Sequence, residues 1–321
     1  VVEELPERRE RAERELACKT YATVEELIAS EKELDLVINA SYSHHHIPLT
    51  IKLLENDYNV LCEKPFGNTV AGVDAAVAAA EKNGKMLFVF QQSRFAPYFR
   101  KVREVVNSGK LGRILQINIE FNSFGRRWDW QTIHEYCAGN LLNTGPHPMD
   151  QAVQFFGEGM PEVKCIMDNA NAFGGAEDYV KILLTGEGKP VIDLEISSCC
   201  AYPECTYKVY GTRGGLKGSM THIEWKYFLE SEAPEQNLSR APISKPDGTP
   251  AYCGEQLPWH EESWDVPEEE SNLFNTIAGR YYNNLYEAIV NGADFEIKLD
   301  EVRRQIAIIE ECHRQNEKLF K

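Results

Sequence analysis

Residues 35–65, with the sequence DLVINASYSHHHIPLTIKLLENDYNVLCEKP, decide the fold class of this chain. An apolar run at residues 35–40 precedes a helical stretch at residues 46–55, and a second apolar run follows at residues 59–62. Short apolar runs separated by a helix are typical of buried parallel strands in a βαβ unit. The alternation extends on both sides, with helices expected at residues 5–16, 23–30 and 70–83 and a strand at residues 86–90. The sequence therefore predicts an α/β domain with a parallel, doubly wound sheet.

A dinucleotide-binding domain normally opens with a strand, a G-x-G-x-x-G turn and a helix that holds the pyrophosphate. This sequence contains no G-x-G-x-x-G, although the units that normally follow that turn are present in order. We expect roughly 25–35 residues, the size of one such βα unit, to precede Val1 in the natural protein. The alternative is a natural chain that lacks the cofactor turn.

The pattern changes after Phe90. A helix is expected at residues 97–108, and closing helices are expected at residues 281–291 and 301–315. Between them, strands are expected at residues 114–124, 179–184, 191–197, 206–210 and 216–220, a spacing that favours an antiparallel or mixed sheet. Residues 222–272 are rich in Pro and Glu and read as an irregular insertion or arm. We therefore predict two domains, at residues 1–93 and 94–321.

Composition excludes several classes of partner. The 321 residues carry 50 acidic and 34 basic side chains, a net charge of −16, which disfavours nucleic acid and anionic membranes. No apolar run approaches the roughly 18 residues that span a bilayer. The nine cysteines are scattered, with no C-x-x-C pair, which favours a reduced, cytoplasmic protein without a metal site.

Residues 138–151, AGNLLNTGPHPMDQ, place polar side chains where a loop enters a helix. On a helical course Asn143, His147 and Asp150 share one face, and two prolines suit the first turn. A histidine at this place can exchange a proton with a substrate hydroxyl. Asp150 either orients His147 or caps the helix. The alternative is an ordinary helix start with a surface histidine.

Five motifs in order resemble the glucose–fructose oxidoreductase / inositol dehydrogenase / rhizopine catabolism (Gfo/Idh/MocA) family. They are D-L-V-I-N-A at 35–40, V-L-C-E-K-P at 60–65, Q-S-R-F-A-P at 92–97, residues 138–150, and Y-K-V-Y-G-T-R-G-G-L at 207–216. The resemblance covers nearly the whole chain except the insertion. It implies a Rossmann domain, NAD or NADP as cofactor, and a C-terminal domain with an open, mostly antiparallel sheet. It also implies a sugar or cyclitol substrate, and a homodimer or homotetramer formed through that sheet.

The resemblance also implies roles for individual residues. Lys64 and His147 correspond to the family's proton-handling lysine and histidine. Asn143 stands where many members carry Asp; an amide cannot act as a base but can hydrogen-bond a substrate hydroxyl. The positions that correspond to cofactor contacts are Glu3, Ser41, Tyr42, Ser43, His46, Glu63, Lys64, Pro65, Gln92 and Arg94.

Some of these positions have a plain alternative. Glu3 either holds the ribose hydroxyls of NAD, which disfavours NADP, or is a solvated acid. His46 follows two other histidines, but consecutive helical residues do not face one another, so we expect local packing rather than zinc.

Substrate contacts are expected from the loop before His147, together with Asn143 and His147 themselves. The loop residues are Arg127, Trp128, Trp130 and His134, because aromatic faces and polar groups suit sugar rings. The two tryptophans are equally compatible with a place in the core.

Three functions remain open at this point. The first is an NAD(P)-dependent dehydrogenase acting on a secondary hydroxyl of a sugar, cyclitol or sugar derivative. The second is a redox-neutral glycosidase or lyase that retains its cofactor, as in some relatives. The third is a non-catalytic sugar or dinucleotide sensor.

Overall fold

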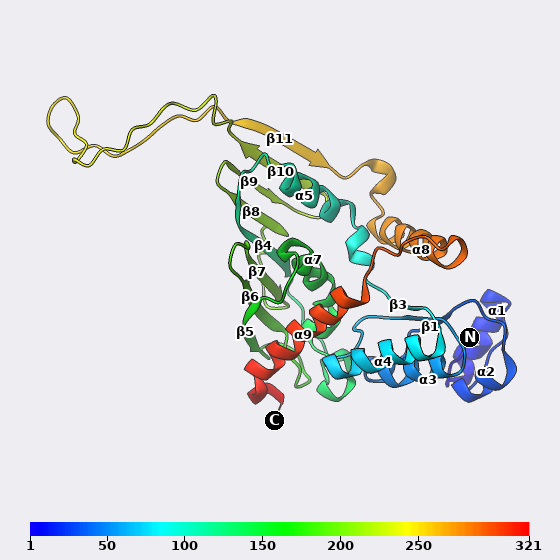
Figure 1. Cartoon of the computed structure of the whole chain (residues 1–321). Coiled ribbons are helices and arrows are strands. Elements are labelled where there is room, and N and C mark those ends of the chain that lie inside the picture. The colour runs from blue at the N-terminus through cyan, green and yellow to red at the C-terminus, as the bar shows by residue number, and fades with distance from the viewer. Residues whose placement is uncertain (321) are drawn as a thin grey trace. The chain divides into compact units, whose positions relative to one another are not determined.

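A computed structural model describes residues 1–320 of the chain (Figure 1). The chain forms two compact units. The first comprises residues Val1–Gly67 and Ala71–Phe90, and the second comprises residues Asn68–Val70 and those from Gln91 onward. Each unit is described by itself below.

The first unit is built on a three-stranded parallel sheet. Its strands are β1 (Val37–Asn39), β2 (Val60–Cys62) and β3 (Leu87–Val89), in that spatial order. The central strand β2 is buried along its whole length, as an apolar strand flanked on both sides must be. The helices are α1 (Pro6–Leu16), α2 (Val24–Ser30), α3 (His46–Glu55) and α4 (Val70–Asn83). The predicted Rossmann-type α/β architecture is confirmed.

At the start of the described chain, Val2 makes a single isolated parallel bridge with Tyr21. The predicted start of α2 holds: the Thr23 hydroxyl accepts the backbone N–H of Glu26 at 3.2 Å. Short-range capping was therefore readable from the sequence, whereas strand pairing was not.

The second unit contains an eight-stranded sheet in the order β11-β10-β9-β8-β4-β7-β6-β5. Within it β4 and β7 pair in parallel, and the other neighbours pair antiparallel. The open, mostly antiparallel sheet is thus confirmed. Its strands are β4 (Ile114–Asn122), β5 (Glu162–Asp168), β6 (Tyr179–Thr185), β7 (Val191–Ser197), β8 (Tyr207–Gly211), β9 (Gly214–Gly218), β10 (His222–Tyr227) and β11 (His260–Asp265).

One face of this sheet carries the core and the helices. Figure 1 shows α5, α7 and α9 along that face. Alternate residues of the central strands are buried beneath them, among them Ile119, Ile182 and Leu194. The helices of the unit are α5 (Pro97–Asn107), α6 (Asn140–Asn143), α7 (Pro146–Phe156), α8 (Leu273–Asn291) and α9 (Leu299–Gln315), preceded by a 3-10 helix, η2 (Gln92–Phe95).

The opposite face of the sheet is polar and half-buried. Lys181 on β6 contacts Asp193 and Glu195 on β7, at 2.6 and 3.0 Å. Among the described residues no helix lies on this face, so it is the open side of the sheet (Figure 1).

The predicted irregular stretch at 222–272 is wrong at both ends. Strands β10 and β11 occupy residues 222–227 and 260–265, which leaves residues 228–259 as a projecting arm (Figure 1). The sequence of β11, HEESWD, lacks apolar alternation because it is an edge strand held mainly by backbone pairing. Helix α8 also begins earlier than expected, at Leu273, and β5 was not foreseen.

Candidate functional site

Asn39 organises the loop that follows β1. Its amide nitrogen donates to the His46 carbonyl and to the Thr50 hydroxyl, both at 3.0 Å. Its oxygen accepts the Ser41 hydroxyl at 2.8 Å and the Ser41 N–H at 3.3 Å. One buried amide therefore fixes the start of the Ser41–Ser43 loop at the carboxyl end of β1, where open α/β sheets bind ligands.

His46 joins that loop to the loop after β2. Its Nδ1 lies 2.7 Å from the Pro65 carbonyl oxygen, and its Nε2 lies 3.0 Å from the Ser41 carbonyl oxygen. Burial lowers the pKa of the ring, which opposes the raising effect of the two carbonyls. Both nitrogens face backbone oxygens, the local packing that the sequence analysis expected of His46.

The E-K-P motif follows β2 directly. Glu63 donates its N–H to the Asn39 carbonyl at 3.0 Å, and its carboxylate accepts the N–H of Lys64 at 3.1 Å. Burial raises the pKa of Glu63, and Lys64 acts in the opposite direction. The peptide bond between Lys64 and Pro65 is cis. Lys64 is half-buried and Tyr42 is exposed on the neighbouring loop.

These residues suit the nicotinamide and ribose part of NAD. The ends of two adjacent parallel strands present serine hydroxyls, an ammonium group and a carboxylate. The groups that would hold the cofactor here are those of Ser41, Tyr42, Ser43, Glu63 and Lys64.

Glu3 already has partners within its own segment. Its carboxylate accepts the Leu5 N–H at 3.1 Å, and its second oxygen lies 3.5 Å from Arg8 Nη1. The carboxylate thus sits at the start of α1, with its side chain 26% exposed. A role in holding the ribose stays a prediction.

In the second unit, Asn143 and His147 lie on either side of a break between two helices. Asn143 ends α6 and His147 is the second residue of α7, which begins with Pro146 as the sequence indicated. Gly145 lies at the break, and a Cβ there would come within 2.1 Å of the Leu141 carbonyl oxygen. Asn143 and His147 are both half-buried.

Buried amides and a hydroxyl hold the backbone around His147. Ser93 donates its hydroxyl to the His147 carbonyl at 3.2 Å. Gln305 on α9 donates to the Pro146 carbonyl at 2.8 Å and accepts from Gln91 at 2.6 Å. The first turn of α7 is therefore positioned by contacts from η2 and α9 rather than by its own sequence.

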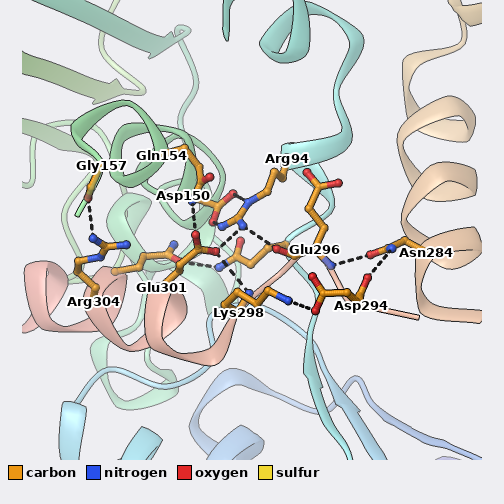
Figure 2. A network of polar contacts seen from close by, with 12 residues as sticks. Arg94, Asp150, Gln154, Gly157, Asn284, Asp294, Glu296, Lys298, Glu301 and Arg304 are labelled. Carbon is orange, nitrogen blue, oxygen red and sulfur yellow. Dashed lines mark hydrogen bonds and ion pairs between the residues drawn. The ribbon is translucent and has the colours of Figure 1, made fainter. Parts of the chain in front are cut away.

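Arg94 forms the centre of a buried ionic network (Figure 2). Its Nε donates to Asp150 Oδ2 at 3.0 Å, its Nη2 pairs with the other Asp150 oxygen, and its Nη1 contacts Glu301 and the Glu296 carbonyl. Burial acts to lower the pKa of Arg94, but Asp150 and Glu301 outweigh it and raise that pKa. The side chains of Arg94 and Asp150 are 1% and 2% exposed.

This network bears on two predicted site residues. Asp150 does not cap α7, since it is the fifth residue of that helix and both its oxygens contact Arg94. Arg94 was expected beside the nicotinamide, and the structure instead engages all three of its guanidinium nitrogens with protein oxygens. Gln92 is half-buried at the start of η2.

The loop predicted to contact substrate has mixed surroundings. Trp128 is 79% exposed, so it is not a core residue. Trp130 packs edge-on against Tyr136, and the His134 ring lies 4.5 Å from that of Phe320. Arg127 contacts Asp129 at 2.6 Å. Substrate contact by these residues stays a prediction.

Asn39, Ser93 and Gln305 were missed by sequence reasoning. Gln305 carried a signal, because it is a polar residue in the apolar stripe of α9 that contains Val302, Ile306 and Ile309. Asn39 carried one too, because it is a polar residue at the end of an apolar strand. The structure shows that it is 2% exposed. Ser93 is a small residue in a polar segment and carried none.

The comparisons with known proteins agree with this architecture. Residues 1–91 match the model of the oxidoreductase family with an NAD-binding Rossmann fold, and residues 99–217 match that of the GFO/IDH/MocA C-terminal domain. No helix of residues 1–320 is long and apolar enough to cross a membrane.

Three relatives illustrate the range of the matches. An uncharacterized oxidoreductase of Schizosaccharomyces pombe is 24% identical over 93% of this chain and 83% of its own. The 2,7-anhydro-N-acetylneuraminate hydratase of Escherichia coli is 26% identical over 89% of this chain and 82% of its own. The structure of the WlbA dehydrogenase from Bordetella pertussis, in complex with NADH and UDP-GlcNAcA, aligns with a TM-score of 0.78 at 18% identity. That alignment covers 99% of this chain and 87% of the WlbA chain.

Both parts of the chain thus match models of one family, in the same order as the two structural units. The first unit is an NAD-binding Rossmann domain, and the chain belongs to the Gfo/Idh/MocA family of oxidoreductases.

Proposed function

We propose that the protein is an NAD-dependent dehydrogenase that oxidises a secondary hydroxyl of a sugar, a cyclitol or a sugar derivative. The observation that supports the proposal is that each unit holds one titratable side chain, for which we propose a role in proton transfer, beside buried and hydrogen-bonded backbone. Lys64 follows the end of the buried strand β2. His147 lies in the first turn of α7, whose backbone carbonyls accept hydrogen bonds from Ser93 and Gln305. Relatives named as dehydrogenases that act on diols or bind nucleotide sugars support the class.

The chemistry assigned to the chain is management of one proton and of the substrate's orientation. When bound, NAD accepts the hydride from the carbinol carbon. His147 takes the hydroxyl proton, and Lys64 stabilises the charge that develops on the oxygen. Asn143 cannot take a proton and serves as a hydrogen-bond partner of a substrate hydroxyl. Asp150 acts indirectly, because its pair with Arg94 anchors the helix that carries His147.

The test is NADH formation, followed by absorbance, with a panel of neutral sugars, uronic acids, N-acetylated sugars and cyclitols. We expect turnover with NAD, and a loss of about 100-fold or more in kcat for Lys64→Met and for His147→Ala. Lys82→Met and His222→Ala are matched controls, because each removes the same side-chain type from an exposed position. Parent-level rates in the Lys64→Met, His147→Ala double variant would exclude this site.

A redox-neutral reaction is the second candidate. The observation that favours it is the match to two hydratases, one at 26% identity over most of this chain and the other at 26% over 74% of it. Such a reaction consumes substrate without net NADH, so product analysis by mass spectrometry separates it from dehydrogenation. If the protein binds NAD and a sugar but turns over neither, the result would instead support the non-catalytic sensor.

We also propose that the protein is cytoplasmic and forms a homodimer or homotetramer through the open face of the sheet. All nine cysteines are free thiols, as in a reducing compartment. The open face presents Lys181, Asp193 and Glu195 half-buried, with Leu183 beside them. Light scattering is expected to show an oligomer that Leu183→Arg dissociates, and a monomeric parent would refute the proposal.

A further inference from the structure

Two adjacent carboxylates, Glu177 and Asp178, lie buried just before β6 and have different surroundings. The Asp178 carboxylate accepts three backbone N–H groups, from residues 170, 171 and 172, at 2.8, 2.7 and 2.6 Å. Asp178 therefore anchors the turn after β5, and its hydrogen bonds are made within that turn.

Glu177 instead supports the start of α6. Its Oε1 accepts the Leu141 N–H at 3.0 Å, and its own carbonyl accepts the Asn140 N–H at 2.9 Å. Gly139 packs directly on the carboxyl group, since a Cβ there would lie 2.3 and 2.4 Å from its two oxygens. The Glu177 side chain is thus in direct contact with Gly139 and Leu141, two residues before Asn143, while the Asn140 side chain holds the same segment to Asp178 and Ser198.

The second oxygen of Glu177 has no donor. Its Oε2 is buried and has no hydrogen-bond partner among residues 1–320. The titratable groups that face it are Asp178 on the same loop and the Cys312 thiol on α9, which adjoins Cys165 on β5. Contact with Cys165 and burial raise the pKa of Cys312, so it contributes no charge.

A buried carboxylate with one unsatisfied oxygen and no cation beside it is costly, whereas a neutral carboxylic acid costs much less. Burial, helped by the nearby Asp178, accordingly raises the pKa of Glu177 to about 7, against the lowering effects of the Leu141 amide and of its own backbone amide.

We propose that Glu177 is a positioning residue for the segment that carries Asn143 and His147, and that it holds this segment as the neutral acid. Loss of the Glu177 proton leaves an uncompensated negative charge on its carboxylate, next to the backbone of Gly139 and Leu141. The charge is relieved when water reaches it, which requires this segment to open. The inference rests on the proposed function only for the use made of His147, since the hold itself is a property of the fold.

The test is amide hydrogen exchange, read by mass spectrometry on the full chain from pH 6.0 to 8.5 and corrected for the intrinsic rate. In the parent protein we expect protection of residues 140–147 to fall by about 10-fold from pH 6.0 to 8.5, most of it as pH rises through 7, and then to level off. The reason is that the carboxyl has a pKa of about 7 in the closed segment and an ordinary pKa of 4.5 once the segment opens. Glu177→Gln keeps an acceptor for Leu141 and cannot ionise, so its protection is expected to stay high across the range. Glu177→Ala is expected to be less protected than the parent at pH 6.0 and to show no dependence on pH.

Glu162→Gln, which removes an exposed carboxylate on β5, is the matched control and should follow the parent protein. The same pH dependence in Glu177→Gln and the parent, or a flat profile in both, overturns the proposal. If Glu177→Ala does not fold, the Gln comparison alone still decides. The experiment needs no substrate, so its outcome is independent of the search for NADH formation. If that activity is found, Glu177→Gln should also flatten the fall of kcat as pH rises through 7, a change that a purely structural role would not produce.

Discussion

Replacement of Asp150 by Ala is expected to destabilise the second unit far more than loss of an ordinary ion pair. The variant leaves the Arg94 guanidinium, 1% exposed, with Glu301 and one carbonyl but without its two-oxygen partner. Removing one partner of a buried ion pair lowers the free energy of unfolding by about 3–5 kcal/mol, because the remaining buried charge is not solvated by water. At about 2–4 °C per kcal/mol for a unit of this size, the melting temperature should fall by roughly 6–20 °C.

The chain offers a matched comparison and a selective probe. Arg127 and Asp129 form a pair whose side chains are 35% and 48% exposed, and Asp129→Ala should cost less than about 1 kcal/mol. All five tryptophans lie at positions 128, 130, 225, 259 and 264, within the second unit, so their fluorescence reports its unfolding.

A double variant separates loss of the ion pair from loss of packing. In Arg94→Met, Asp150→Leu, apolar side chains replace both charges, and the melting temperature is expected to recover partly, with a coupling of about 1–3 kcal/mol between the two sites. A shift below about 2 °C for Asp150→Ala, or additive effects in the double variant, would refute the reasoning from burial.

Three further predictions concern single positions. His46→Ala should lower the free energy of unfolding by roughly 2–4 kcal/mol and weaken NADH binding, measured by urea unfolding and fluorescence titration. The reason is that a buried ring is removed and the carbonyl oxygen that accepts its one N–H loses that donor. Gly139→Ala should cost over about 3 kcal/mol, since φ is +109° and the Cβ meets Glu177, whereas Gly84→Ala, with nothing within 4 Å, should cost about 1. Burial lowers the pKa of His313 from 6.5 to about 4, so this residue contributes stability above pH 6.5 that is lost as pH falls towards 4. Between pH 7 and 4, the free energy of unfolding of His313→Asn, measured by urea titration, should therefore fall by about 3 kcal/mol less than that of the parent. An equal fall in both proteins would contradict this assignment.

The fold was largely predictable because its strands carry strong local signals. The runs at residues 37–39 and 60–62 are short, apolar and separated by a helix, which leaves few arrangements other than parallel pairing. Strand β11 was not predictable, because an edge strand with the sequence HEESWD is defined by hydrogen bonds to β10 rather than by side-chain alternation.

The site was only partly predictable, because sequence motifs identify residue types but not their partners. The sequence indicated that Asp150 lies near His147 on a helix, and α7 confirms that both belong to it. It gave no indication that Arg94, 56 positions earlier, takes up both oxygens of Asp150. Contacts of such long separation depend on tertiary packing, for which a single sequence carries no local signature.

The position of β4 has a consequence for how the second unit folds. Strands β5–β7 and β8–β11 are each made of antiparallel neighbours close in sequence, apart from the arm, and β4 joins the two sets. Strand β4 is the first strand of this sheet to be synthesised, and its residue Gln116 pairs with Val191, about 75 residues later. Both neighbours of β4 are therefore synthesised long after it. Closing loops of that length is slow compared with forming hairpins. We therefore expect the two local meanders to form before β4, the earliest of these strands to be synthesised, is inserted between them.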